Sequence, residues 1–147
     1  MKFTILIEPE AKQRPRVMMK GGHPLIYSPS ENKKAEDAIR REATRQLDMQ
    51  PIKKDVPLIL KAVFYRRKPD SKSKKVLYPV SKPDIVNYLS LLCDALEAFA
   101  YENDSQIVDV IVGKRYGSPP RIEIEIEEKF NEGRAKEIEQ TVINLNA

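Results

Sequence analysis

A strictly alternating segment, residues 121–128, sets the strongest limit on the architecture of this chain. Ile122, Ile124 and Ile126 alternate there with glutamates. Successive side chains of a β-strand point to opposite faces of a sheet, so the pattern predicts a strand with one buried face and one face in water. The chain therefore contains a sheet, and part of that sheet is exposed to solvent.

Periodic patterns elsewhere in the chain predict further strands and helices. Strands are expected over 2–8, 56–65 and 106–116, and helices over 31–48, 84–99 and 132–145. Ser28 or Ser30 can cap the first helix. The turn at 117–120 joins the last two strands at hairpin spacing. The order β-α-β-α-β-β-α predicts an α/β protein of the α+β type, with a mixed sheet of about four or more strands packed against helices.

The size of the chain fits one domain, residues 1–147, at 16.9 kDa. Its uncharged apolar stretches are far shorter than the roughly 18 to 20 residues that a membrane-spanning helix needs. The apolar run at the N-terminus is too short for a signal peptide, so we expect a cytoplasmic protein. The chain has a single cysteine, Cys93, which excludes an intramolecular disulfide. It also has a single histidine, His23, so a zinc site or a Cys/His nucleophile is a poor hypothesis.

Basic residues are concentrated in the middle of the chain, over residues 66–82. Seven basic residues stand there against one acidic residue, and they are Arg66, Arg67, Lys68, Lys72, Lys74, Lys75 and Lys82. The segment also carries prolines and serines, so it cannot pack as a core element, and its charge would attract a phosphate backbone. A solvated loop without a ligand is the alternative.

A second basic segment lies near the N-terminus, at Lys12-Gln13-Arg14-Pro15-Arg16. The proline holds the backbone extended, so Arg14 and Arg16 are presented on a short rigid strip that suits bidentate contact with phosphate. Together the two basic segments indicate nucleic acid as the partner.

The helix expected over 84–99 carries one polar stripe on an otherwise apolar surface. The stripe consists of Asp84, Asn87, Ser90, Asp94 and Glu97. A further aspartate, Asp104, follows at a helix-to-strand corner. Carboxylates that converge beside a basic surface are a common arrangement for holding Mg²⁺ against a phosphate. The alternative is that Asp84 is only a helix cap, Asp94 a solvated side chain and Asp104 a turn residue.

Three short motifs make the chain resemble a known family. They are Lys12-Gln13-Arg14-Pro15-Arg16, followed by Tyr27-Ser28-Pro29; Lys82-Pro83-Asp84-Ile85-Val86-Asn87, with Cys93-Asp94-Ala95-Leu96; and Asn103-Asp104-Ser105-Gln106-Ile107, with Lys114 further on. In these motifs the chain resembles the RusA family of Holliday-junction resolvases. The resemblance runs from residue 12 to about residue 128 and leaves the helix within 130–147 outside it.

The resemblance implies a homodimer that binds four-way DNA junctions and cuts them with Mg²⁺ or Mn²⁺. Asp84 and Asp104 match aspartates that bind the catalytic metal, and Asp94 matches a third acidic position. The expected DNA-binding residues are Lys12, Arg14, Arg16, Arg66, Arg67, Lys68, Lys72, Lys74, Lys75, Lys82 and Lys114. A dimer also suits the two-fold symmetry of a junction. Its interface is expected either at an edge of the strand 56–65 or on the apolar side of the last helix.

The chain departs from the family pattern at three positions. Val86 stands in place of a second aspartate, Ser90 in place of a lysine, and Asn103 in place of the first aspartate of the later acidic pair. Two alternatives to an active endonuclease therefore stay open: a junction-binding protein that no longer cleaves, and a nucleic-acid-binding module without preference for junctions.

Overall fold

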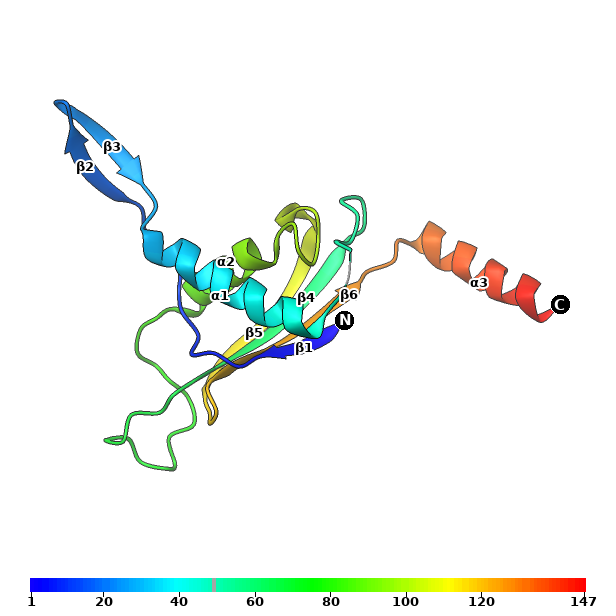
Figure 1. Ribbon diagram of the computed structural model, residues 1–147. Helices are drawn as coiled ribbons and strands as arrows, with labels where there is room; N and C mark the ends of the chain where they lie inside the picture. The colour runs from blue at the N-terminus through cyan, green and yellow to red at the C-terminus, as the bar shows by residue number, and fades with distance from the viewer. Residues whose placement is uncertain (49) are drawn as a thin grey trace.

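The computed structural model describes residues 1–48 and 50–147 and is built around a four-stranded mixed sheet (Figure 1). The strands across the sheet are, in order, β1 (Lys2–Ile5), β6 (Arg121–Glu128), β4 (Leu58–Arg66) and β5 (Ile107–Tyr116). β4 runs parallel to β5 and antiparallel to β6, and β6 runs antiparallel to β1. The mixed sheet expected from the sequence is confirmed.

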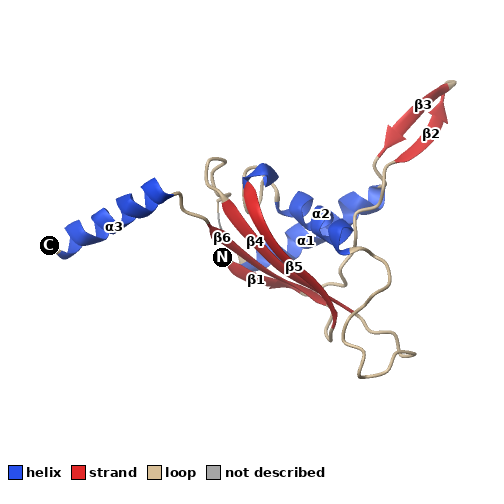
Figure 2. Cartoon of the chain, turned by 180° about the vertical axis from the view of Figure 1, so that it is seen from behind, coloured by secondary structure: helices blue, strands red, loops and turns tan. Residues whose placement is uncertain are grey.

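The hydrophobic core lies between one face of this sheet and two helices, α1 (Ser30–Gln46) and α2 (Ile85–Leu96) (Figure 2). The strands bury Phe3, Ile5, Leu58, Leu60, Ala62, Phe64, Ile122, Ile124 and Ile126, and α1 buries Ala35, Ile39 and Ala43. The rings of Phe64 and Tyr88 stack across the interface, with centroids 5.1 Å apart. The glutamates of β6 lie on the other face, where Glu127 pairs with Lys61 at 2.8 Å. This is the solvent-exposed face that the alternation predicted.

β5 and β6 do not form the hairpin expected from the turn between them, because β4 lies between the two strands. β4 thereby pairs its backbone on both edges, as a buried strand must. The connecting loop passes the end of β4, where the Gly117 N–H donates to the Arg66 carbonyl at 3.1 Å. A Cβ on Gly117 would lie 2.6 Å from Tyr65, so only glycine fits there. Since β4 has no free edge, the dimer interface considered along this strand is wrong.

Both core helices are shorter than predicted. α1 ends at Gln46, and its N-cap is Pro29, so the cap expected from Ser28 or Ser30 is not observed. α2 ends at Leu96 rather than near Phe99, because Ala98 adopts a left-handed φ of 63°. This turn stops the helix and returns the chain toward the core.

Two elements project from the body of the molecule (Figures 1 and 2). The hairpin of β2 (Arg16–Lys20) and β3 (His23–Tyr27), called here the β2–β3 ribbon, was not predicted. Helix α3 (Glu132–Asn146) was predicted to within one residue at its end. Within the part of the chain that the structure describes, no helix is long and apolar enough to span a membrane.

Candidate active site

Three carboxylates come together just beyond the end of α2. Asp94 and Glu97 stand at the end of this helix, and Asp104 lies in the short 3-10 helix η1 (Asp104–Gln106). One oxygen from each carboxylate lies within 4.8 Å of the other two. Asp104 is exposed and the other two are half-buried. We call Asp94, Glu97 and Asp104 the acidic cluster; carboxylate oxygens at this spacing suit a hard divalent cation.

Packing of α2 determines where these carboxylates point. The helix buries Tyr88, Leu91, Leu92, Ala95 and Leu96 against the core. Its polar stripe, which includes Ser90, Asp94 and Glu97, therefore lies on the less buried side. Beyond the helix, the Tyr101 hydroxyl donates to the Cys93 carbonyl at 2.8 Å and so ties the returning chain to the last turn. This contact holds the segment before Asp104 close to Asp94.

A capping box fixes η1 and with it Asp104. The Asn103 side chain accepts a hydrogen bond from the Ser105 N–H at 2.9 Å, and the Gln106 side chain accepts one from the Asn103 N–H at 2.9 Å. The buried Gln106 amide also donates to the carbonyls of Lys53 and Val56. Asparagine and aspartate cap equally well. Asn103, one of the departures from the family pattern, thus has a structural role that either residue can fill.

Lys12 reaches the acidic cluster from the N-terminal basic strip. Its ammonium group lies 2.5 Å from Asp94 Oδ2, and its backbone N–H donates to the Asn87 carbonyl at 3.0 Å. The hydrogen bond to Asp94 raises the pKa of Lys12, against the opposing effect of burial. The next residue, Gln13, is held through its backbone by the buried Asn32 amide at 2.8 and 3.0 Å. Sequence reasoning assigned Lys12 to DNA contact and missed its ion pair with Asp94.

Helix α1 also supports the cluster. The Arg40 guanidinium donates to the carbonyls of Asp94 and Ala95, both at 2.9 Å, and so fixes the end of α2. Glu36 lies one turn earlier on α1, and burial, followed by the nearby Asp94 charge, raises the pKa of its carboxyl group. Sequence reasoning missed both residues, because their spacing along α1 gives no sign that this face meets the end of α2.

Asp84 does not join the acidic cluster. It occupies the N-cap position of α2, ten residues before Asp94, which corresponds to about 15 Å along a helix. Its side chain makes no capping hydrogen bond, so the interpretation of Asp84 as only a helix cap is not supported. It lines a surface hollow of about 520 Å³ together with Lys12, Arg14, Lys82 and Asn87. Lys12 thus lies between the two acidic sites.

The structure also places Val86 and Ser90, the other two departures from the family pattern, and Glu102. Val86 lies on the first turn of α2 with 69% of its surface exposed, and Ser90 is half-buried one turn further. Glu102, which precedes Asp104 by two residues, accepts hydrogen bonds from the Lys54 N–H and the Lys53 ammonium, which lower its pKa. Its carboxylate is therefore engaged outside the acidic cluster.

Two of the expected DNA-binding residues hold the backbone before Asp84. Arg66 donates to the Lys82 carbonyl at 2.8 Å, and Lys114 donates to the carbonyls of Ser81 and Pro83 at 3.0 Å. Lys72, Lys74, Lys75 and Lys82, like Arg14, Arg16 and Arg67, are exposed. Because its two ends are held and its middle is exposed, the basic loop 66–82 presents its ammonium groups to solvent.

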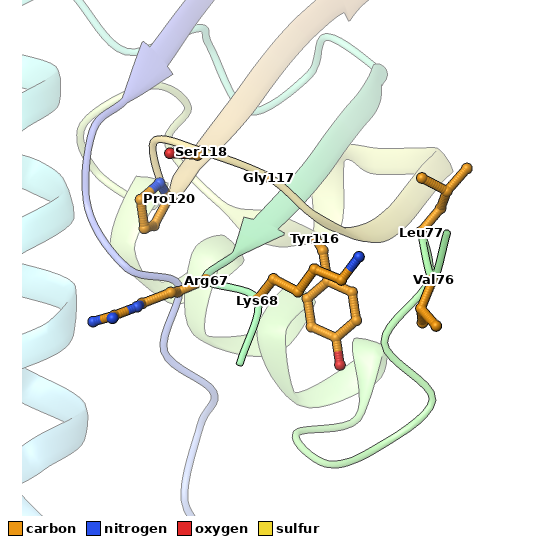
Figure 3. Close-up of a pocket in the computed structure, with 8 residues that line it drawn as sticks. All are labelled: Arg67, Lys68, Val76, Leu77, Tyr116, Gly117, Ser118 and Pro120. Atoms are coloured by element: carbon orange, nitrogen blue, oxygen red, sulfur yellow. The ribbon is translucent and has the colours of Figure 1, made fainter. Parts of the chain in front are cut away.

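The basic loop also folds against the end of β5 and forms a pocket of about 480 Å³ (Figure 3). Tyr116 forms one wall, and the ammonium group of Lys68 lies 5.9 Å from the centre of its ring. Val76 and Leu77 line the side opposite Lys68, and the Tyr116 N–H donates to the Leu77 carbonyl at 3.1 Å. The pocket therefore combines an aromatic wall with positive charge.

Two comparisons show which known proteins this chain resembles. Residues 7–127 match the family model described as endodeoxyribonuclease RusA. The chain is also 33% identical over 136 residues to the uncharacterized protein YqaN of Bacillus subtilis (strain 168), and the match covers 87% of this chain and 96% of that protein. The matched region includes every residue of the acidic cluster and the whole basic loop.

Proposed function

Because the chain belongs to the RusA endodeoxyribonuclease family, we propose that it resolves four-way DNA junctions by metal-dependent hydrolysis of phosphodiester bonds. The observation that carries the proposal is the convergence of Asp94, Glu97 and Asp104 within 4.8 Å. The resemblance that motivates the proposal also assigns a metal-binding role to Asp84.

The donor set of the acidic cluster fits a hard divalent cation. Three carboxylates offer oxygen ligands, and Mg²⁺ or Mn²⁺ commonly takes the rest of its coordination shell from water and substrate phosphate. When bound, such an ion supplies an activated water and stabilises the charge on the phosphate. Asp94, Glu97 and Asp104 would hold it, and Lys12 offsets the mutual repulsion of the carboxylates and lies where a phosphate can approach.

The basic residues supply affinity for DNA in this proposal. The exposed loop lysines, among them Lys72 and Lys74, lie free of the structural contacts that engage Arg66 and Lys114. Contacts of this kind bind the phosphate backbone without reading sequence. We propose that they hold the arms of a branched DNA while the acidic cluster acts on the strand between them.

A homodimer is part of the proposal, since two equivalent sites suit the two strands that must be cut in a junction. Of the two interfaces considered from the sequence, the apolar side of α3 is still available. Ile138, Val142 and Leu145 are exposed on that helix by 43 to 80%.

The second candidate function is a junction-binding protein that does not cleave, and two observations favour it. Val86 offers no ligand at the family's second aspartate, and Asp84 stands apart from the acidic cluster. If this function is right, replacing Val86→Asp and Ser90→Lys together raises nicking from the background level. No gain in nicking would show that these two positions did not disable the site.

The experiment that separates the two functions is cleavage of an end-labelled synthetic four-way junction across Mg²⁺ and Mn²⁺ concentrations at fixed salt. A linear duplex of the same sequence serves as the control. The proposal predicts paired symmetric nicks in the junction alone. Tight junction binding without nicks in either metal would establish the second function, and equal binding of junction and duplex would contradict both.

A further inference from the structure

Apart from Arg16, the β2–β3 ribbon is a surface that the proposed function does not use. It extends away from the sheet and helices (Figures 1 and 2), and all ten of its strand residues are exposed. Gly21 and Gly22 form its tip with φ of 58° and 78°, a turn that suits two-residue hairpins. A lone two-stranded hairpin is only marginally stable in water. A partner that covers this element would therefore stabilise it.

The two faces of the ribbon differ in chemistry. The register pairs Val17 with Ile26 and Met19 with Pro24, so one face is wholly apolar. Val17, Met19 and Ile26 are exposed by 65, 66 and 71%. On the other face, Met18 and Leu25 are flanked by the pairs Arg16 with Tyr27 and Lys20 with His23.

The charge of this region restricts the class of partner. Residues 11–30 contain four lysines and arginines and no aspartate or glutamate. All charged side chains of this segment are basic, and apolar side chains lie among them. Such a surface suits a ligand that combines negative charge with flat apolar surfaces. Nucleic acid has both, in its phosphates and in its bases once they are unstacked. A two-stranded ribbon also has the width that a major groove of about 12 Å admits.

The base of the ribbon is fixed to the candidate active site. Lys12 contacts Asp94 and the Asn87 carbonyl, and Asn32 holds Gln13. Only three residues separate Lys12 from Arg16, the first residue of the ribbon, which places their Cα atoms at most about 14 Å apart. DNA whose phosphate reaches Asp94 therefore lies within reach of the ribbon.

We propose that the β2–β3 ribbon inserts into the opened centre of the branched DNA. Its apolar face, Val17, Met19, Pro24 and Ile26, packs against bases that lose a stacking neighbour at the branch point, and Arg16 and Lys20 contact the adjacent phosphates. The proposal rests on the proposed function for the identity of the DNA, but its test does not depend on cleavage.

The test uses 2-aminopurine, whose fluorescence rises when the base is unstacked, placed at the branch point of a four-way junction. The variant Val17→Thr with Ile26→Thr removes the apolar contact and keeps β-branched residues, which favour strands. The control is Leu6→Thr, because Leu6 is exposed to a similar degree, 62%, outside the ribbon. Fluorescence, junction affinity and, without DNA, sedimentation are measured for each protein.

The wild-type protein and the Leu6 variant are expected to raise the fluorescence equally. The double variant should lose most of this rise and bind the junction about tenfold more weakly, since two apolar contacts are removed. A further variant, Lys20→Gln, should keep the rise and lower the slope of log affinity against log salt by about 0.9, as expected for one lost phosphate contact.

Two results would overturn the inference. The first is an equal fluorescence rise in the double variant and the wild-type protein. The second is a change of oligomeric state in the double variant without DNA, which would assign the apolar face to a protein interface. If the wild-type protein shows no preference for junctions, the proposed function fails separately. The fluorescence change in bound linear duplex then decides the role of the ribbon: a rise that the double variant loses supports insertion, and an unchanged signal overturns it.

Discussion

In the proposed function the acidic cluster and the basic loop act on the same DNA, but they are built in opposite ways. Each residue of the cluster is positioned by packing and hydrogen bonds: Arg40 fixes the end of α2, and Gln106 fixes η1. The loop is held near its ends by Arg66, Lys114 and the Leu77 carbonyl, and four of its lysines, Lys72, Lys74, Lys75 and Lys82, are exposed. Chemistry on a phosphodiester requires groups held in place, whereas attraction to a phosphate backbone requires mainly charge.

The largest expected effect is on the rate of cleavage, and it leaves the affinity for DNA unchanged. Asp104→Asn removes one charge from the acidic cluster and should lower the rate of junction cleavage by at least about 100-fold, because metal ligation depends on charge and geometry. Junction affinity, measured without metal, should stay within about twofold of the wild-type value, since the loop is untouched. Asp109→Asn is the control, because Asp109 lies on β5 and pairs with Lys129 outside the cluster. Equal cleavage by both variants would show that the cluster is not the site.

The reverse pattern is expected when the loop loses its charge. Replacing Lys72, Lys74 and Lys75 by alanine should weaken junction binding and lower the slope of log affinity against log salt by about 2.7, which corresponds to three phosphate contacts. Cleavage at saturating DNA should be unchanged. An unchanged salt slope in a titration series would show that the loop is solvated and does not touch DNA.

A substitution at Gln106 tests how far the acidic cluster depends on the hydrogen bonds that fix η1. Gln106→Ala leaves the carbonyls of Lys53 and Val56 without their donor and removes the acceptor for the Asn103 N–H, at an expected cost of about 1–3 kcal/mol in the free energy of unfolding. Urea denaturation measures this cost, and cleavage should fall as Asp104 loses its fixed position. Gln140→Ala on α3 is the matched control, with an exposed glutamine. Loss of stability without loss of cleavage would show that η1 need not be fixed.

The smallest effect concerns Cys93, which adjoins the cluster but lies partly buried against the core. Burial raises the pKa of its thiol to about 11. At pH 8 only about one molecule in a thousand carries the reactive thiolate. A thiol reagent should therefore modify the native protein slowly, faster as the pH approaches 11, and quickly after unfolding in urea. Rapid, complete modification of the native protein at pH 8 would contradict the burial of this residue.

Local sequence patterns predicted most single elements but not how they pair. The alternation at 121–128 identified β6 and its exposed face. The turn at 117–120 showed that the chain reverses, but no local signal showed that β4 lies between the reversed strands, because strand pairing depends on contacts far apart in the sequence. The β2–β3 ribbon did carry a local signal, Gly21-Gly22 between two five-residue runs, which is typical of a two-residue hairpin turn.

The candidate site was also predictable only where it depends on local spacing along the chain. The polar stripe on α2 pointed to Asp94 and Glu97, since both follow from helical spacing. The pairing of Lys12 with Asp94 and the support from Arg40 depend on contacts over 82 and 54 residues, which spacing cannot show. Asp84 and Asp94 are ten residues apart, which is about 15 Å along a helix. This spacing alone was enough to predict that Asp84 lies outside the cluster.

Binding of Mn²⁺ measured by calorimetry tests the role of the acidic cluster most directly, because it depends on neither DNA nor cleavage. The proteins compared are the wild type, the triple variant Asp94→Asn with Glu97→Gln and Asp104→Asn, and the Asp109→Asn control. We expect the wild type and the control to bind Mn²⁺ with equal affinity and the triple variant to lose this binding. Equal binding by the triple variant would place the metal elsewhere and contradict the assignment of catalysis to the acidic cluster.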